Sequence, residues 1–242
     1  MMRLYHTSDL HNRGGIAQPL QAMRAQEPGL LFDSGDSLRG SQTVYYRDEP
    51  IIAELDAARY DAQAVGNREF HYLYGCLRAR AARMRHPLIC SNLIDLKGRP
   101  LPFESARAID IEGGRRAHVL GLLVGQYPKD SPWERIFGWR FLDPQAIVAE
   151  YAAALAGGDL LIVLSHLGLV RDRDLARAVP RIDVILGGHS HDTLPEPAIE
   201  AQVPIIHAGP YGRFVSRSQF SVASAGKKAW ELQAFELVPL LH

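Results

Sequence analysis

The sequence predicts an α/β fold, and three observations support this prediction. Short apolar runs recur along the 242 residues, and longer amphipathic stretches separate them. Several runs, such as "HVLGLLVG" and "LLIVLS", are continuously apolar, which is typical of strands that are buried on both faces. Hydrophobic residues make up 47% of the chain, enough for one large domain or two small ones. Because no domain boundary or repeat is evident, we expect a single domain over residues 1–242.

The apolar runs predict eight strands, at residues 3–8, 29–34, 62–65, 87–91, 117–124, 160–165, 184–186 and 205–208. The amphipathic stretches between them predict helices at about 15–26, 49–59, 73–84, 143–156 and 171–179. The helix at 143–156 has the clearest boundaries, because Asp143 can cap its N-terminus and Gly157 can end it. The tail, roughly 213–238, predicts a β-hairpin with Ala225 and Gly226 near its turn.

Composition excludes several classes of protein. Basic and acidic residues number 27 each, so the formal net charge is zero, which argues against a dedicated nucleic-acid or membrane-surface binder. The arginines of "LRARAARMRH" (Arg78, Arg80, Arg83 and Arg85) are interpreted as a solvated helix face rather than a phosphate-binding patch. Two cysteines without metal-type spacing fit a reducing compartment. Neither a secretory leader nor a membrane-spanning run is evident, so we expect a cytoplasmic protein.

Side chains that can bind metals follow five of the apolar runs. In open α/β sheets, ligands bind beyond the carboxyl ends of the strands, where loops from several strands converge. Single residues of this kind are usually only hydrogen-bonded, but seven of them at five strand ends predict one shared metal site. The seven candidate ligands are Asp9, His11, Asp36, Asn67, His166, His189 and His191.

The types and number of these residues suggest what they bind. Asp, Asn and His without a thiolate suit divalent ions such as Mn²⁺, Zn²⁺ or Fe²⁺. Seven ligands exceed what one ion takes while leaving an open position, so two ions that share a carboxylate fit better. Two such ions stabilise the attacking and leaving oxygens of a phosphoryl displacement, and a bridging water of lowered pKa is the nucleophile.

Other polar residues receive lesser roles. His207 also ends an apolar run, and we name it a candidate substrate-binding residue that lines the pocket. The remaining histidines, His6, His86, His118 and His242, are interpreted as ordinary hydrogen-bonded residues. "GPYGR" is glycine-rich but follows no nucleotide-loop pattern, so it is interpreted as a turn.

At these residues the chain resembles the calcineurin-like metallophosphoesterases, and more narrowly the N-terminal catalytic domain of their 5′-nucleotidase and 2′,3′-cyclic-phosphodiesterase branch. The matching pieces include "SDLHN", "DSGDSLRGS", "YDAQAVGNREF", "LIVLSHLGLVRDRDLA" and "ILGGHSH", in family order over almost the whole chain. The resemblance implies a four-layer sandwich of two mixed β-sheets flanked by helices. It also implies one metal held by Asp9, His11, Asp36 and His191, and a second held by Asp36, Asn67, His166 and His189.

The chain departs from the family in two ways. That branch usually carries a C-terminal domain that binds the nucleoside, and the sequence ends after the catalytic part, so nucleotide specificity does not transfer. The family's loop pairs a His, which assists at the leaving group, with an Asp three residues on. Here Arg68 and His71 occupy those two positions in "GNREFH".

Arg68 changes the expected chemistry. A guanidinium cannot give up a proton near pH 7, but it can offer charge and donors to phosphoryl oxygens. His71 is then the candidate for a relocated acid, or a supporting group behind the site. A surface ion pair of Arg68 with Glu69 or Asp61 is the alternative.

The function predicted from these residues is a two-metal hydrolase of small phosphomonoesters or phosphodiesters, nucleotides included. A second hypothesis is a catalytically weakened, metal-dependent phosphate- or nucleotide-binding protein, because the usual catalytic His is Arg68. A third is a nuclease, against which the neutral charge weighs, so no nucleic-acid or membrane partner is expected. The oligomeric state is left open.

Overall fold

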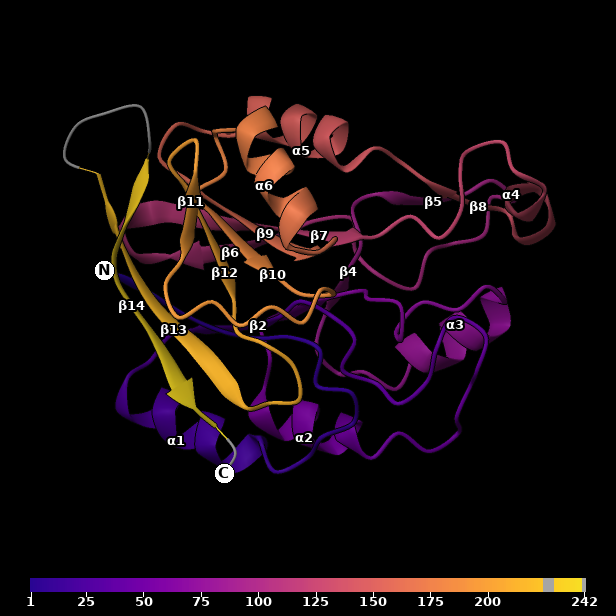
Figure 1. Ribbon diagram of the computed structural model, residues 1–242, viewed down its shortest axis with the longest axis horizontal. Coiled ribbons are helices and arrows are strands. Elements are labelled where there is room, and N and C mark those ends of the chain that lie inside the picture. The colour runs from indigo at the N-terminus through magenta and orange to yellow at the C-terminus, as the bar shows by residue number, and fades with distance from the viewer. Residues whose placement is uncertain (224–228, 241–242) are drawn as a thin grey trace.

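The computed structural model describes residues 1–223 and 229–240, and two six-stranded β-sheets dominate it (Figure 1). The first sheet has the order β14-β13-β1-β2-β3-β4. Strands β1 to β4 run parallel, whereas β13 and β14 extend the sheet with antiparallel pairing. These strands are β1 (Met2–Thr7), β2 (Leu30–Asp33), β3 (Ala62–Ala64), β4 (Leu88–Ile89), β13 (Phe214–Val222) and β14 (Trp230–Pro239).

The second sheet has the order β11-β12-β10-β9-β7-β6. Its four central strands are parallel, and both edge strands are antiparallel to their neighbours. The central strands carry near-continuous apolar residues because both of their faces are buried. Its strands are β6 (Arg107–Ile111), β7 (Arg115–Leu123), β9 (Leu160–His166), β10 (Val184–Gly187), β11 (Ala198–Glu200) and β12 (Val203–His207).

Helices cover the outer face of each sheet. Helices α1 (Ala17–Gln26) and α2 (Ile51–Ala58) share a buried apolar cluster with the first sheet. Helices α5 (Pro144–Ala153) and α6 (Leu169–Ala178) share one with the second sheet (Figure 1). The predicted sandwich of two mixed sheets flanked by helices is therefore confirmed.

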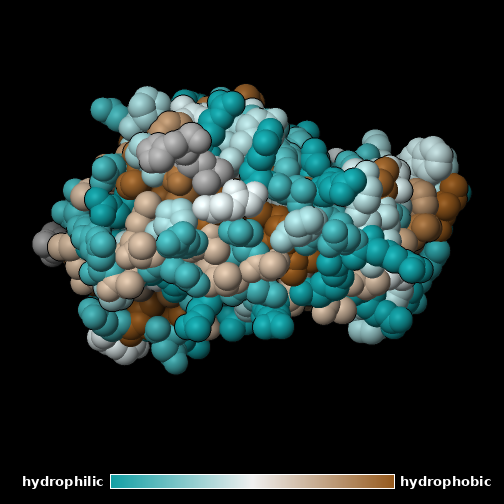
Figure 2. Space-filling model, turned by 90° about the horizontal axis from the view of Figure 1, so that it is seen from below, coloured by the Kyte–Doolittle hydropathy of each residue, from teal (hydrophilic) through white to brown (hydrophobic). Residues whose placement is uncertain are grey.

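A smaller unit extends from one end of the sandwich (Figure 1). Strands β5 (Leu93–Asp95) and β8 (Trp139–Phe141) pair antiparallel, and α3 (Tyr74–Ala81) and α4 (Pro132–Phe137) lie at the same end. Aromatic residues that include Phe70 and Trp139 form its core. Seen from below, the molecule is mainly hydrophilic, and apolar side chains show at several separate places, one of them the end that carries α4 (Figure 2).

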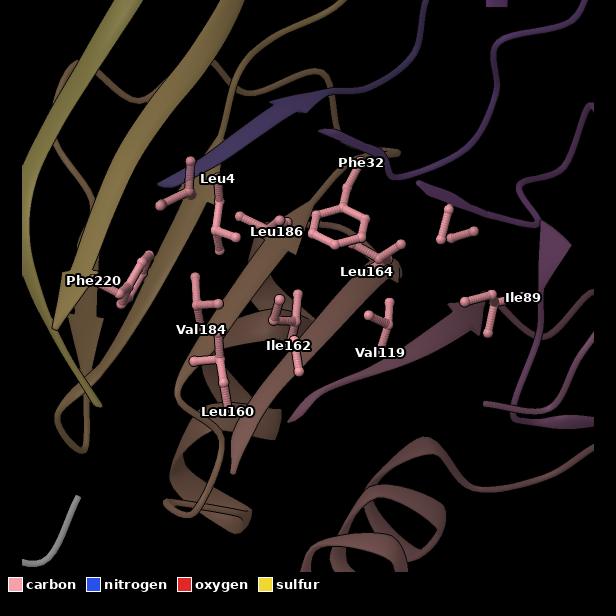
Figure 3. Packing of buried hydrophobic residues seen from close by; sticks show 14 of the residues in the cluster. Leu4, Phe32, Ile89, Val119, Leu160, Ile162, Leu164, Val184, Leu186 and Phe220 are labelled. Carbon is pink, nitrogen blue, oxygen red and sulfur yellow. The ribbon is translucent and has the colours of Figure 1, made fainter. Parts of the chain in front are cut away.

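The main hydrophobic core lies between the two sheets. Leu4 and Phe32 of the first sheet face Ile162 and Leu186 of the second (Figure 3). The backbones of the two sheets lie close together at β4 and β7, where a Cβ added to Gly121 would lie 2.3 Å from the carbonyl oxygen of Ile89. Glycine is therefore required at this crossing.

Each predicted strand and helix is present, with ends that differ from the prediction by at most three residues. The predicted tail hairpin forms from β13 and β14, but Ala225 and Gly226 lie outside the described residues. Sequence reasoning missed β5, β6, β8, β11, α4 and a 3₁₀ turn at Glu112–Gly114. No helix in the described ranges combines the length and apolar character that crossing a membrane requires.

The arginine cluster of α3 requires a correction. Arg80, interpreted as part of a solvated face, is only 2% exposed. Its guanidinium donates to the carbonyl oxygens of Arg68, Phe70 and Val44. Backbone acceptors from two loops explain how a cation is retained in the interior, because hydrogen bonds compensate the cost of burying its N–H groups.

Candidate metal centre

The parallel strands of both sheets direct their carboxyl ends to one edge, and polar contacts join the sheets there. The hydroxyl of Ser34, directly after β2, donates to Leu186 O at 2.6 Å. The carbonyl oxygen of Ser34 accepts from His166 Nδ1, at the end of β9, at 2.8 Å. Loops from β1, β2, β3, β9 and β10 consequently meet at this edge.

The first cluster at this edge contains Asp9, His11 and His191. One potential ligand atom from each lies within 4.8 Å of the others. His11 Nε2 and His191 Nε2 are 2.9 Å apart, and Asp9 Oδ1 lies 3.5 Å from His191 Nε2. Burial and the charge of Arg68 lower the pKa of His11 to about 4, so its ring is neutral and has a lone pair near pH 7.

The second cluster contains Asp9, Asp36 and His166, all buried, within the same 4.8 Å limit. Because a carbonyl can only accept, His166 Nδ1 must donate to Ser34, which leaves the lone pair of a neutral ring on Nε2. That nitrogen lies 3.3 Å from Asp36 Oδ1 but makes no hydrogen bond. Burial lowers the pKa of His166, but the charge of Asp36 outweighs burial and raises it to about 10.

Asn67 and His189 complete the group. Asn67 Nδ2 lies 3.5 Å from His189 Nδ1, and Asn67 Oδ1 accepts from Gln126 Nε2 at 2.8 Å. Gln126 also donates to the carbonyl oxygen of Val124, directly after β7, at 2.7 Å. The side chain of Gln126 is therefore held in place beside Asn67. Because the rings of His166 and His189 also lie 5.0 Å apart, the seven predicted ligands form one connected group at this edge.

The backbone of this edge is unusual, because five of the seven candidate ligands have left-handed φ angles. The angles are 52° for Asp9, 48° for His11, 59° for Asp36, 73° for His189 and 60° for His191. Non-glycine residues rarely adopt this region, and Asn, Asp and His do so most readily. Such conformations concentrate at functional sites, where the surrounding structure compensates their cost.

Glu69 fixes the loop that presents Asp36. Its buried carboxylate accepts from the backbone N–H groups of Asp36, Ser37 and Gly66 at 2.8–3.0 Å. Glu69 is therefore occupied by backbone donors and does not pair with Arg68.

Arg68 lies beside Asp36. Its Nε is 3.8 Å from Asp36 Oδ2, its backbone N–H donates to Asp36 Oδ1 at 2.8 Å, and Nη1 donates to Arg39 O at 3.2 Å. Asp61, the other suggested partner, bonds to Arg24 instead. The permanent cation therefore borders the candidate ligands, where it can contact a bound anion.

Two predicted residues lie outside the group. His71 is 3% exposed, and its Nδ1 accepts from the N–H of Leu73. Burial lowers the pKa of His71. His207 is 1% exposed and bonds to Asp172, which also accepts from Ser165. These contacts fit supporting roles behind the site better than contact with substrate.

Tyr211 is a site residue that the sequence interpretation missed. Its ring centroid lies 5.4 Å from that of His11 and 5.8 Å from that of His191. Its N–H donates to Asp9 O at 2.8 Å, so it packs against the first cluster. "GPYGR" does form a turn, as interpreted, and only the aromatic residue between two glycines hinted at a further role.

The donor set fits divalent cations. In a neutral His166, the lone pair on Nε2 would face a carboxylate oxygen, an arrangement that only a cation or an added proton stabilises. His11 and His191 likewise direct ring nitrogens at each other beside Asp9. Neutral imidazole and carboxylate ligands are those that Mn²⁺, Zn²⁺ and Fe²⁺ accept.

A protein-family model agrees with this geometry. The model described as calcineurin-like phosphoesterase matches residues 2–193, which contain all seven candidate ligands. The chain belongs to the calcineurin-like phosphoesterase family. The prediction of a hydrolase acting on phosphate esters is confirmed at the level of this family, and divalent metal ions are implied by it.

Relatives within the calcineurin-like phosphoesterases support this assignment. The uncharacterized metallophosphoesterase YunD of Bacillus subtilis (strain 168) is 32% identical over 92% of this chain and 50% of its own length. The 5′-nucleotidase of Homo sapiens is 24% identical over 88% of this chain and 45% of its own length. The crystal structure of a 5′-nucleotidase precursor from Thermus thermophilus superposes with a TM-score of 0.76 at 25% identity, covering 99% of this chain and 54% of that one. The chain thus spans about half the length of these relatives.

Proposed function

We propose that the chain is a two-metal phosphoric ester hydrolase that acts on small phosphomonoesters or phosphodiesters, with nucleotides among the candidates. The convergence of Asp9, Asp36 and His166 within 4.8 Å of one another, beside the cluster of Asp9, His11 and His191, is the observation that carries this proposal, because carboxylate and imidazole groups gathered in this way are ligands that divalent ions bind. Asp9, His11 and His191, with Asp36, would hold one ion.

Asp36, Asn67, His166 and His189 would hold the second ion, with Asp36 shared. Holding it requires the amide of Asn67 to turn its oxygen toward His189, where its nitrogen now lies. When bound, the ions supply positive charge to phosphate oxygens and acidify the attacking water. The single domain proposed for residues 1–242 contains all of these groups.

The chain's own contribution is to position the phosphate and to stabilise its charge. Arg68 is 34% exposed in its side chain and already contacts Asp36, so it can donate to a phosphoryl oxygen beside the ligands. It cannot protonate a leaving group. General acid help is typically worth about 10²–10⁴-fold, so substrates with poor leaving groups should lose most.

The test is a series of substituted phenyl phosphates with Mn²⁺, together with elemental analysis of the purified protein. We expect about two bound ions per chain and rates that rise steeply as the pKa of the leaving phenol falls. Rates that do not change across the series would contradict the assignment of Arg68. A protein that binds no metal would contradict the two-metal site.

A second candidate is a metal-dependent phosphate- or nucleotide-binding protein with weakened catalysis. The presence of Arg68 where relatives of this branch are expected to have an imidazole favours it. Turnover of phenyl phosphate separates the two candidates, because a binding protein retains the metals and the anion affinity without multiple turnover.

A further inference from the structure

A cavity of about 290 Å³ opens beside the candidate metal ligands. It is lined by Asp36, Asn67 and Arg68 and by residues of the loop from Arg39 to Tyr46. A phosphate held by the ligand group would lie beside this space, which offers room for its ester substituent. In a monoester that substituent is the leaving group.

The walls of this cavity are fixed by buried charges. Glu49 is 2% exposed, and its carboxylate accepts the N–H groups of Arg39 at 2.8 Å and Gly40 at 3.0 Å. On the other side of the loop, the buried guanidinium of Arg80 donates to Val44 O. Arg80 also holds Arg68 O, so one cation joins both walls.

Arg39 lines the cavity. Its Cζ lies 4.1 Å from the ring centroid of Tyr46, a distance at which the cation and the aromatic face attract each other. Within residues 1–223 and 229–240, none of the protein's acceptors receives a hydrogen bond from this guanidinium, although it carries five N–H groups. Its donors are therefore free to bind a group that enters the cavity.

The charges around the cavity favour an anion. Arg39 and Arg68 each contribute a permanent positive charge, and Asp36 is the one acidic residue among those lining it. In the proposed function, bound ions neutralise Asp36. The cavity is then positively charged, and a guanidinium matches the geometry of carboxylate and phosphate.

We propose that this cavity binds a leaving group that itself carries a negative charge, as a carboxylate or a second phosphate, and that Arg39 determines this specificity. The inference rests on the proposed function. A water oxygen forms a bond to phosphorus, and the bond from phosphorus to the ester oxygen breaks. Its electron pair stays on the departing oxygen, and the protons of the attacking water pass to solvent.

The test compares three substrates with the full chain and Mn²⁺: phenyl phosphate, 4-carboxyphenyl phosphate and 1,4-phenylene bisphosphate. The variant is Arg39→Gln. The control is Arg47→Gln. Arg47 is exposed, directly follows the loop and does not line the cavity, and the substitution removes the same charge. The two charged substrates distinguish carboxylate from phosphate recognition.

For Arg39→Gln we expect kcat/KM to fall about tenfold for one or both charged substrates, the size of one lost charge-assisted hydrogen bond. The change for phenyl phosphate should stay within about threefold, and Arg47→Gln should change none of the three more than that. Equal losses on all three substrates would place Arg39 at the transferred phosphate and overturn the proposal. Unchanged rates on all three would also overturn it.

Binding gives a second readout that does not depend on turnover. Phenylphosphonate and 4-carboxyphenylphosphonate cannot be hydrolysed, and their Kd values can be measured by calorimetry with Mn²⁺ against a protein-free blank. A third compound, 1,4-phenylenebisphosphonate, carries a second phosphonate in place of the carboxylate. If the cavity recognises a carboxylate, Arg39→Gln should weaken the binding of only the carboxylated compound. If it recognises a phosphate, the substitution should weaken the binding of the bisphosphonate. If wild-type protein hydrolyses no ester but shows this difference, the proposed function fails while the anion cavity is retained.

Discussion

Arg68 carries a charge that no accessible pH removes, and it lies beside a carboxylate that is a candidate bridging ligand. An imidazole in this position would titrate near neutrality and could donate a proton. The difference between the two side chains concerns one step, the departure of the ester oxygen. Position 68 is therefore where substrate range can be changed without altering the ligands.

For Arg68→His we expect alkyl phosphates, whose leaving groups need a proton, to be hydrolysed faster by about 10-fold or more. The dependence of rate on the pKa of the leaving phenol should become shallower. Steady-state kinetics on ethyl phosphate and phenyl phosphate would measure both effects. A fall in alkyl-ester turnover would show that the guanidinium is already the better group there.

Arg80 shows what residue types alone do not reveal. Its place in an arginine-rich stretch predicts solvation, yet it satisfies carbonyl oxygens of Arg68, Phe70 and Val44. Those acceptors lie 10 to 36 residues before Arg80, in two different loops, so only tertiary structure brings them together at the helix. The metal-capable residues were easier to predict, because each follows its own apolar run directly.

For Arg80→Met we expect the free energy of unfolding to fall by about 3 kcal/mol, because several buried carbonyl groups lose their donor. Urea unfolding would measure this loss. Arg83→Met, on the same stretch, should change stability by less than about 0.5 kcal/mol. Equal effects of the two substitutions would contradict the structural role of Arg80.

At the scale of elements, the sequence predicted the strands that are buried on both faces and the tail hairpin, and it missed four others, β5, β6, β8 and β11. Strand β6 alternates in burial and lies at an edge, and β11 has three residues. Such segments have too few apolar residues for a periodic signal, and pairing with a neighbouring strand determines their conformation. Helix α4 has only six residues, although Ser131 caps it.

The crossing of β4 and β7 gives an element-scale prediction. For Gly121→Ala we expect a loss of about 3 kcal/mol or more, because the added methyl group meets the backbone of Ile89, which cannot move without shifting a strand. Gly75→Ala, on α3, is the control: a Cβ there meets nothing within 4 Å. Alanine should stabilise that helix by up to about 1 kcal/mol. Thermal unfolding would measure the melting temperatures of both variants. Equal shifts of the two melting temperatures would contradict the prediction.

At the scale of the whole molecule, the site exists because two sheets bring their carboxyl ends to the same edge. The sequence predicts that edge from where its polar residues fall, but the family resemblance was needed to predict two sheets rather than one. Which strands pair with one another cannot be predicted from short stretches of the sequence. The order within each sheet, and the contact of Ser34 with Leu186 across them, follows from packing of the complete chain.

Stability of the whole chain should also depend on pH through His86. Burial lowers the pKa of His86 to about 4, whereas the unfolded value is near 6.5. The folded state therefore binds fewer protons between these values. The contribution of neutral His86 is complete above pH 6.5 and is lost as pH falls toward 4.

Between pH 6.5 and pH 4, the free energy of unfolding should fall less in His86→Gln than in the wild type. The difference between the two falls should be about 3 kcal/mol. Other buried histidines act alike in both proteins and cancel in the comparison. Urea unfolding at several pH values measures the two slopes. Parallel pH profiles would show that His86 accepts its proton without opposing the fold.

The left-handed backbone at five candidate ligands has a consequence for which substitutions the protein tolerates. The residues that adopt this conformation at least cost are glycine, Asn, Asp and His, and two of these also bind metals readily. Selection for folding and selection for catalysis therefore favour overlapping amino acids at these positions. Saturation libraries at Asp36 and His189, screened for soluble yield with a chelator present, should still enrich this small set. Enrichment of alanine or valine instead would mean that the backbone there readjusts.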